Sequence, residues 1–263
     1  MRKFLRLYRV FAVQNLKKLM EYRADFLTGL ISFLISQSFN ILFLGIIFSQ
    51  IPNLAGWTYN QILFIYGFSL LPQGLDHLLT DNLWMVAYFT VRKGEFDKYL
   101  TRPINPLLHV IMEAFQLDAF GELILGIALL CTAAVGLKIT ISAVNILLFL
   151  VAVAAAALIY TDMKIIGAAL AFWLKSSGEV LNMFYDMNDF AKYPTSIYNK
   201  TVRGIVTYII PFALTGFYPA SYFLTGKDPL FCIGVPVLVS LVLLALAYWV
   251  WSRGINAYES AGS

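Results

Sequence analysis

The sequence predicts an all-α polytopic membrane protein, and three observations point to this fold class. Of the 263 residues, 60% are hydrophobic and 13% are charged, whereas soluble domains carry about 25% charged residues. The apolar residues form runs of the ~20 residues that a helix needs to cross a bilayer. Residues 24–91 contain no lysine or arginine, and a short charged segment follows them. Six spans would use roughly half of the chain, which leaves no room for a soluble domain of ordinary size.

Residues 1–23 predict a basic amphipathic helix that lies in the membrane interface. Its apolar side chains recur at helical spacing and its cations lie elsewhere on the helical wheel. Such a helix places its cations among lipid phosphates, so membrane lipid is a predicted partner. A solvated leader to the first span is the alternative. The apolar positions are Phe4, Leu7, Tyr8 and Phe11, and the basic positions are Arg2, Arg6, Arg9 and Lys17.

The whole chain, residues 1–263, reads as one membrane domain with both termini in the cytoplasm. Seven basic residues precede the first span, and basic flanks of a first span stay inside. Asp162 and Lys164 predict a tight inner turn between the fourth and fifth spans. The predicted segments are spans 1–2 at 24–91, an inner turn at 92–106, spans 3–5 at 107–185, an outer re-entrant segment at 186–226, span 6 at 229–251 and a cytoplasmic tail at 252–263.

The segment before the last span is apolar but interrupted. Pro211, Gly216 and Pro219 break residues 210–226, which favours a re-entrant pair of short helices over a regular span. The basic stretch 192–203 would then lie outside, against the positive-inside rule. An alternative therefore places 175–204 inside and makes 205–226 a span.

Six ionisable residues fall within the predicted second and third spans. Charges are costly in lipid, so each carries a functional hypothesis. One interpretation is a polar lining of a translocation path, and the other is hydrated or paired positions at helix ends and in a dimer interface. These residues are Asp76, His77 and Asp81 in the second span and Glu113, Asp118 and Glu122 in the third.

Catalytic and cofactor motifs are absent from the sequence. It contains no GxxxxGK[ST] phosphate loop, no HExxH and no GxSxG. Asp76 and His77 are adjacent and point about 100° apart on a helix, which does not resemble a metal pair. We therefore expect no catalytic residue, no metal and no cofactor in this chain. The net charge of +4 is concentrated in residues 1–23 and does not indicate nucleic-acid binding.

The most informative segment is the polar stretch KGEFDKYLTRPINP at 93–106. It mixes cations with Glu95 and Asp97, and Pro103 and Pro106 close it. A compact charged turn between two long apolar helices is how a membrane protein presents a surface to a soluble partner.

Four ordered segments together resemble one family. The chain is similar to ABC-2 type transporter permeases, in particular to a branch of bacterial six-span permeases with a KGELD-like turn and a final Y-x-S-A/S-G. The segments are KGEFDKYLTRPINPL at 93–107, FAKYPTSIY at 190–198, IPFALTGFYPA at 210–220 and GINAYESAGS at 254–263.

This resemblance implies an exporter permease in the bacterial inner membrane. Two such subunits, identical or homologous, would pair above two cytosolic ATPases, which bind the ATP and Mg²⁺. The resemblance makes the turn a coupling helix that docks on the ATPase, with polar contacts from Glu95, Asp97, Lys98 and Arg102 beside Lys93, and apolar anchors at Phe96, Tyr99 and Leu100. It gives Tyr193, Pro194, Pro211 and Pro219 an architectural role in the re-entrant segment.

Two other functions are open at this point. The first is a secondary transporter that uses an ion gradient through the acidic residues of spans 2 and 3. No convincing inverted repeat relates the two halves of the sequence, which disfavours this reading. The second is a polytopic assembly factor without transport. An ATPase partner would discriminate the ABC permease from both.

Overall fold

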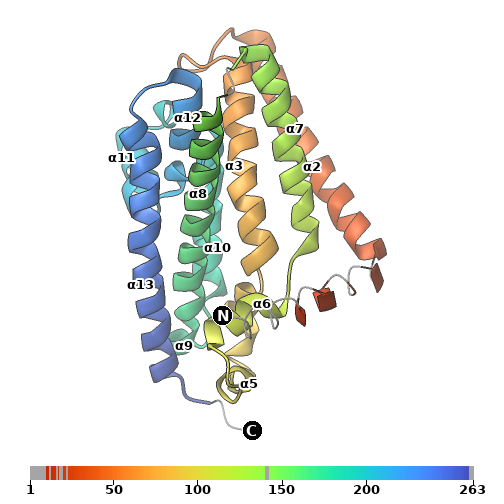
Figure 1. Ribbon diagram of the computed structural model, residues 1–263, viewed down its shortest axis with the longest axis vertical. Coiled ribbons are helices and arrows are strands. Elements are labelled where there is room, and N and C mark those ends of the chain that lie inside the picture. The colour runs from red at the N-terminus through yellow and green to blue at the C-terminus, as the bar shows by residue number, and fades with distance from the viewer. Residues whose placement is uncertain are drawn as a thin grey trace.

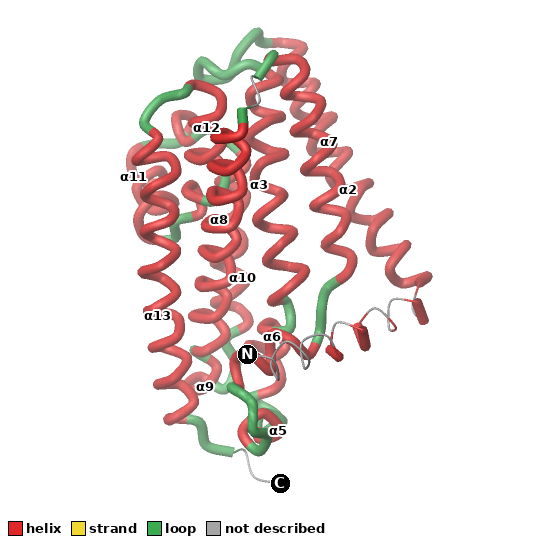
Figure 2. The backbone as a smooth tube through the Cα atoms, in the orientation of Figure 1, coloured by secondary structure: helices red, strands yellow, loops and turns green. Residues whose placement is uncertain are grey.

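The computed structural model describes residues 10–11, 13–15, 17, 20–21, 23–139 and 142–260. In these residues the regular structure is helical, apart from one isolated bridge between Leu54 and Trp57. Long helices run side by side along one axis, and short helices gather at both ends of the bundle (Figures 1 and 2). The chain is an all-α polytopic membrane protein, as its composition predicts.

Within the described residues, five helical segments are long and apolar enough to cross a membrane. A bent pair of shorter helices brings the number to six if it is counted as one span. The five are Phe26–Gln50 in α2 (Arg23–Gln50), α3 (Tyr59–Thr80), α7 (Phe120–Leu137), Ala143–Leu174 in α8 (Ala143–Ala169) and α9 (Ala171–Leu174), and Leu230–Ala257 in η7 (Leu230–Gly234) and α13 (Val235–Ala257).

The helix α3 is the centre of the bundle. Fourteen of its 22 residues are buried, and it packs against α7 and α8. Glycines make the α3–α7 crossing close: a Cβ on Gly67 would lie 2.9 Å from the Cβ of Leu129, and a Cβ on Gly126 would lie 3.0 Å from the carbonyl oxygen of Gly67. Small residues let membrane helices approach in this way. The outer helix α2 leaves seven large apolar side chains exposed, which suits a lipid environment.

The predicted turn at Asp162 and Lys164 is wrong, because α8 runs through both residues. Neither side chain is exposed, and Lys164 pairs with carboxylates of another part of the chain. Lys164 therefore does not need water, and no proline or glycine stops the helix between these two residues. The helical segment continues to Leu174 and ends at Lys175, which has a positive φ of 63°.

The third span also begins later than predicted, at Phe120 instead of near Leu107. A separate helix, α6 (Pro106–Glu113), comes first; Asn105 caps it by accepting a hydrogen bond from the Leu108 N–H. The chain is extended at Ala114 and forms a short 3₁₀ turn, η2 (Leu117–Ala119), before α7. Glu113 and Asp118 therefore lie before the span and not within it.

Short helices cover the end of the bundle where the charged turn lies (Figure 1). The chain reaches the turn from α3 and returns from it into α6. After α9 it runs back along α8. The short elements are α4 (Leu83–Met85), η1 (Val86–Thr90) and α5 (Asp97–Leu100) around the turn, and α10 (Gly178–Asp186) and η3 (Met187–Lys192) on the returning segment.

The segment before the last span is broken, as predicted. The helical stretches Lys200–Ile209 and Phe212–Thr225 meet at an angle of 73°, and Pro211 lies at the break. Both lie toward the end of the bundle opposite α5 (Figure 1), whereas Lys175 lies beside Arg92 at the α5 end. The alternative, which keeps all of residues 175–204 on one side, therefore does not fit the structure. The elements are η4 (Thr195–Ile197), α11 (Lys200–Gly204), η5 (Ile205–Ile209), η6 (Phe212–Leu214) and α12 (Phe217–Thr225).

Most of the predicted interfacial helix lies outside the described residues, including Phe4, Leu7 and Tyr8 and the arginines Arg2, Arg6 and Arg9. Phe11 and Lys17 are described and are helical. The ring of Phe11 lies 5.8 Å from that of His109 in α6. The N-terminal segment therefore comes near the charged turn, and its position in a membrane interface stays a prediction.

Candidate functional site

The charged turn is anchored to the bundle by aromatic side chains. Phe96 is completely buried, and its ring packs 4.8 Å from Phe172 at the end of the fourth span and 6.0 Å from Trp251 in α13. Tyr258, just after α13, packs 5.4 Å from the same ring. Phe96 thus joins the turn to two membrane-spanning segments that are distant in sequence.

A second set of contacts joins the turn to α6. Lys98 Nζ lies 2.9 Å from Glu113 Oε1, and the Tyr99 hydroxyl donates to Glu113 Oε2. Partial burial alone would raise the pKa of Glu113, but the hydrogen bonds from Tyr99 and Lys98 outweigh it and hold the pKa below its usual range. Burial and the neighbouring Glu113 carboxylate raise the pKa of Tyr99. The carboxylate therefore stays charged and keeps α5 attached to α6.

Arg102 closes the turn against the same helix. Its Nη1 donates to His109 Nε2 over 3.0 Å. Because Arg102 can only donate, the Nε2 atom accepts and the imidazole is neutral. Burial and the Arg102 cation both lower the pKa of His109, which agrees with a neutral ring.

The C-terminal motif meets the turn in space. Ser260 Oγ donates to Asp97 Oδ2 over 2.6 Å, across 163 positions of sequence. Together with the ring contact between Tyr258 and Phe96, this brings two of the four recognised segments together. The sequence could not predict this contact, because neither segment has a local pattern that indicates which distant segment it packs against.

The outward surface of the turn differs from the predicted one. Phe96 and Tyr99 are 0% and 2% exposed, so they do not present apolar anchors to a partner. Their burial follows from the aromatic cluster at the ends of the spans. Of the predicted docking residues, the exposed ones are Lys93, Glu95, Lys98, Leu100 and Arg102, and Asp97 is half-buried beside Ser260.

A buried ion cluster lies further inside the bundle. Lys164 Nζ in α8 lies 2.8 Å from Asp76 Oδ2 in α3 and 2.9 Å from Asp81 Oδ1 at the end of α3. The side chains of Lys164 and Asp76 are fully buried. Polar neighbours complete the shell of Asp76: the hydroxyls of Thr80, Thr161 and Tyr185 donate to it over 2.6, 3.1 and 2.5 Å.

This cluster is a clamp between the second and fourth spans. The lysine and the two carboxylates compensate one another's charge. Removal of any one of them would leave a buried charge without its partner, which is strongly unfavourable, so this clamp depends on all three side chains. The sequence points to Asp76 and Asp81 as functional candidates, but the predicted turn at Lys164 hides its role as their partner. The signal was present, since Lys164 is a lone cation in a 32-residue apolar segment.

A neighbouring pair joins the second and third spans. His77 Nδ1 in α3 lies 2.8 Å from Glu122 Oε1 in α7, and the His77 ring stacks 6.0 Å from Tyr185. Since Tyr185 also donates to Asp76, the two polar groups are contiguous. Of the predicted path residues, four lie in this connected region, whereas Glu113 belongs to the turn and Asp118 lies against Gly29 of α2.

Asp162 is a second residue that the sequence interpretation misplaced. Its side chain is fully buried in α8, and neither carboxylate oxygen has a hydrogen-bond partner among the described residues. Across the same residues, His, Cys, Asp and Glu side chains do not gather in any group of three suited to a metal ion.

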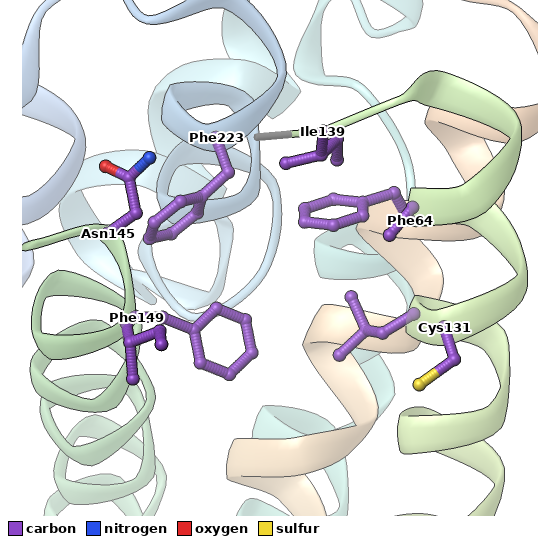
Figure 3. Close-up of a pocket in the computed structure, with 9 residues that line it drawn as sticks. Phe64, Cys131, Ile139, Asn145, Phe149 and Phe223 are labelled. Atoms are coloured by element: carbon purple, nitrogen blue, oxygen red, sulfur yellow. The ribbon is translucent and has the colours of Figure 1, made fainter. Parts of the chain in front are cut away.

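An apolar pocket lies between α3, α7, α8 and α12. Its volume is about 240 Å³. The rings of Phe64, Phe149 and Phe223 converge on this space, with Asn145 near its rim (Figure 3). Such a lining suits an apolar group and offers no charge to bind an ion.

The comparisons with known proteins agree with this architecture. A family model described as ABC-2 family transporter protein matches residues 34–262. The chain belongs to this family. It is therefore a membrane-spanning permease subunit of an ABC transporter, and the match includes the charged turn, the buried ion cluster and the broken segment. No curated protein and no solved structure matches the chain significantly.

Proposed function

We propose that this ABC-2 permease exports its substrate across the bacterial inner membrane, with two permeases above two cytosolic ATPases. In this proposal ATP and Mg²⁺ bind the ATPases alone. The turn at 92–106 is the docking surface, and both termini are cytoplasmic. The observation that carries the proposal is the turn itself, a surface of exposed charges built on a rigid aromatic anchor.

The anchor gives docking a mechanical consequence. When the ATPases close on ATP, they displace α5. Through Phe172 and Trp251, Phe96 transmits this displacement to the Ala143–Leu174 and Leu230–Ala257 helical segments, and Glu113 transmits it to α6. Packed helix interfaces of this kind shift between discrete arrangements. Such a shift would open the translocation path first to one side of the membrane and then to the other.

In this proposal the polar region between α3, α7 and α8 lines the translocation path or forms its gate. His77 is 23% exposed at the side chain, whereas Glu122 and Lys164 are almost or fully buried. The same titratable residues would suit an ion-gradient transporter, but membership of the ABC-2 family favours ATP as the energy source.

The docking test reverses one exposed charge. Glu95→Lys changes an exposed residue of the turn that has no ion pair or side-chain hydrogen bond among the described residues. We expect the variant to insert and fold normally but to lose the ATPase on co-purification from native membranes in mild detergent. The matched control is Lys138→Glu, a charge reversal at an exposed residue that ends α7, near the opposite end of the bundle. Equal ATPase recovery from both variants and the wild type would exclude Glu95 from the docking surface.

A further inference from the structure

A polar pocket lies at the α5 end of the bundle, apart from the buried ion cluster. Its volume is about 300 Å³. Three segments that are distant in sequence form its walls: the start of the charged turn, the end of the Ala143–Leu174 helical segment and the C-terminal tail. The lining residues are Val91, Arg92, Phe172, Trp173, Lys175, Ala257, Glu259 and Ser260.

The pocket contains charges of both signs. Arg92, Lys175 and Glu259 line it, and all three are exposed. None of them forms an ion pair within the part of the chain that the structure describes. Lys175 also has a positive φ, a backbone conformation that non-glycine residues rarely adopt. Arg92 lies over the ring of Phe89, with its guanidinium carbon 5.6 Å from the ring centroid, and this contact leaves its N–H groups without an ion-pair partner. The site thus offers two cations and one carboxylate that a charged ligand could pair with.

The pocket lies where the apolar surface of the fourth span ends. Trp173 and Leu174 are 47% and 58% exposed, and Lys175 follows them directly. Tryptophan is enriched at the level of the lipid headgroups, and a basic residue at the end of a span reaches the same level. A ligand with apolar chains could therefore lie along Trp173 and Leu174 with its headgroup in the pocket.

We propose that this pocket binds a glycerophospholipid whose headgroup carries both a phosphate and a primary amine, as phosphatidylethanolamine does. The phosphate lies between Arg92 and Lys175, and the ammonium pairs with Glu259. Basic pockets on the cytoplasmic side of spans bind lipid phosphates in this way. The carboxylate selects an amine, because it would repel a headgroup that carries only negative charge. It can accept hydrogen bonds from a primary ammonium but not from the quaternary ammonium of phosphatidylcholine. This inference rests on the proposed cytoplasmic position of the α5 end, but not on the ATPase or on the direction of transport.

Native mass spectrometry of the purified protein in mild detergent tests the proposal. The probes are dioleoyl phosphatidylethanolamine, phosphatidylglycerol and phosphatidylcholine, which share the same chains. The quantity compared is the dissociation constant for the first lipid molecule bound. We expect this constant to be lower for phosphatidylethanolamine than for either of the other two lipids. Arg92→Gln combined with Lys175→Gln should lower that affinity roughly thirtyfold, because each basic residue near the surface contributes roughly a fivefold factor.

Two controls keep the result specific. Lys138→Gln combined with Lys227→Gln removes two exposed cations that do not line this pocket and should leave the affinity unchanged. Arg92→Lys combined with Lys175→Arg keeps both charges and should retain most of the binding. Glu259→Gln should remove the preference for phosphatidylethanolamine over phosphatidylglycerol while binding of phosphatidylglycerol persists.

Three outcomes would overturn the inference. Equal affinity of the wild type and the double glutamine variant would exclude the pocket. Competition by soluble glycerophosphoethanolamine as effective as that by the intact lipid would show that chains contribute nothing and exclude a lipid as the ligand. A wild-type preference for phosphatidylglycerol that Glu259→Gln does not change would exclude the amine.

Discussion

Two lysine–carboxylate pairs hold different parts of this permease, and their surroundings separate their roles. Lys164 and Asp76 are fully buried between α8 and α3, whereas Lys98 and Glu113 are 43% and 31% exposed at the turn. The distances are nearly equal, 2.8 and 2.9 Å. Water can replace either partner at the turn but not inside the bundle. The buried pair therefore determines whether the spans assemble, and the exposed pair only adjusts how the turn is held.

The largest expected effect comes from Lys164→Met, which leaves Asp76 and Asp81 without their cation. We expect the free energy of unfolding to fall by ~3–5 kcal/mol, the usual effect of leaving a buried charge unpaired. Thermal unfolding in detergent and the yield of monodisperse protein would measure the loss. Adding Asp76→Asn and Asp81→Asn should restore much of it, because all three charges are then absent. A single variant as stable as the wild type would contradict the clamp.

An intermediate effect is expected from removal of the Phe96 ring, which joins the charged turn to the membrane-spanning helices. Phe96→Ala removes a buried ring that contacts Phe172 and Trp251, and truncation of a buried phenylalanine costs ~3–5 kcal/mol when it is part of a core. We expect the lower end of this range, since the ring lies at the edge of the bundle. Phe89→Ala, at a ring that is 38% exposed, is the matched control and should cost less than ~1 kcal/mol. Similar melting temperatures for both variants would show that Phe96 does not anchor the turn.

The smallest effect should come from Glu113→Gln. The pair is partly exposed, so its loss should cost less than ~1 kcal/mol at neutral pH. Because the folded pKa of Glu113 is below its ordinary value of 4.5, the wild type gains this stability above that value and loses it as the pH falls through the lower folded pKa. Stability curves of the two proteins should therefore differ at pH 7 and converge in strong acid. A difference that persists in acid would mean that the carboxylate is not the source.

Sequence patterns predicted the helical class, the charged turn and the broken segment, because apolar length, charge density and proline are local properties. They failed at Asp162 and Lys164, where a pair of charges resembled a turn. The error has a physical cause. A lysine can be buried inside a span only if carboxylates pair with it, and here those carboxylates are distant in sequence. A local sequence pattern does not show which distant residues will pair. The same limit explains why Phe96 and Tyr99 were expected on the surface of the turn.

The contact between Ser260 and Asp97 also imposes an order on biosynthesis. Asp97 leaves the ribosome 163 residues before Ser260. At typical synthesis rates this delay is roughly ten to thirty seconds. During that interval the turn lacks Tyr258 and Ser260, so its packed form is incomplete. In a nascent chain the charged turn therefore lacks its contacts with Tyr258 and Ser260. A protein that binds only the completely packed turn would not bind permeases that are still being synthesised.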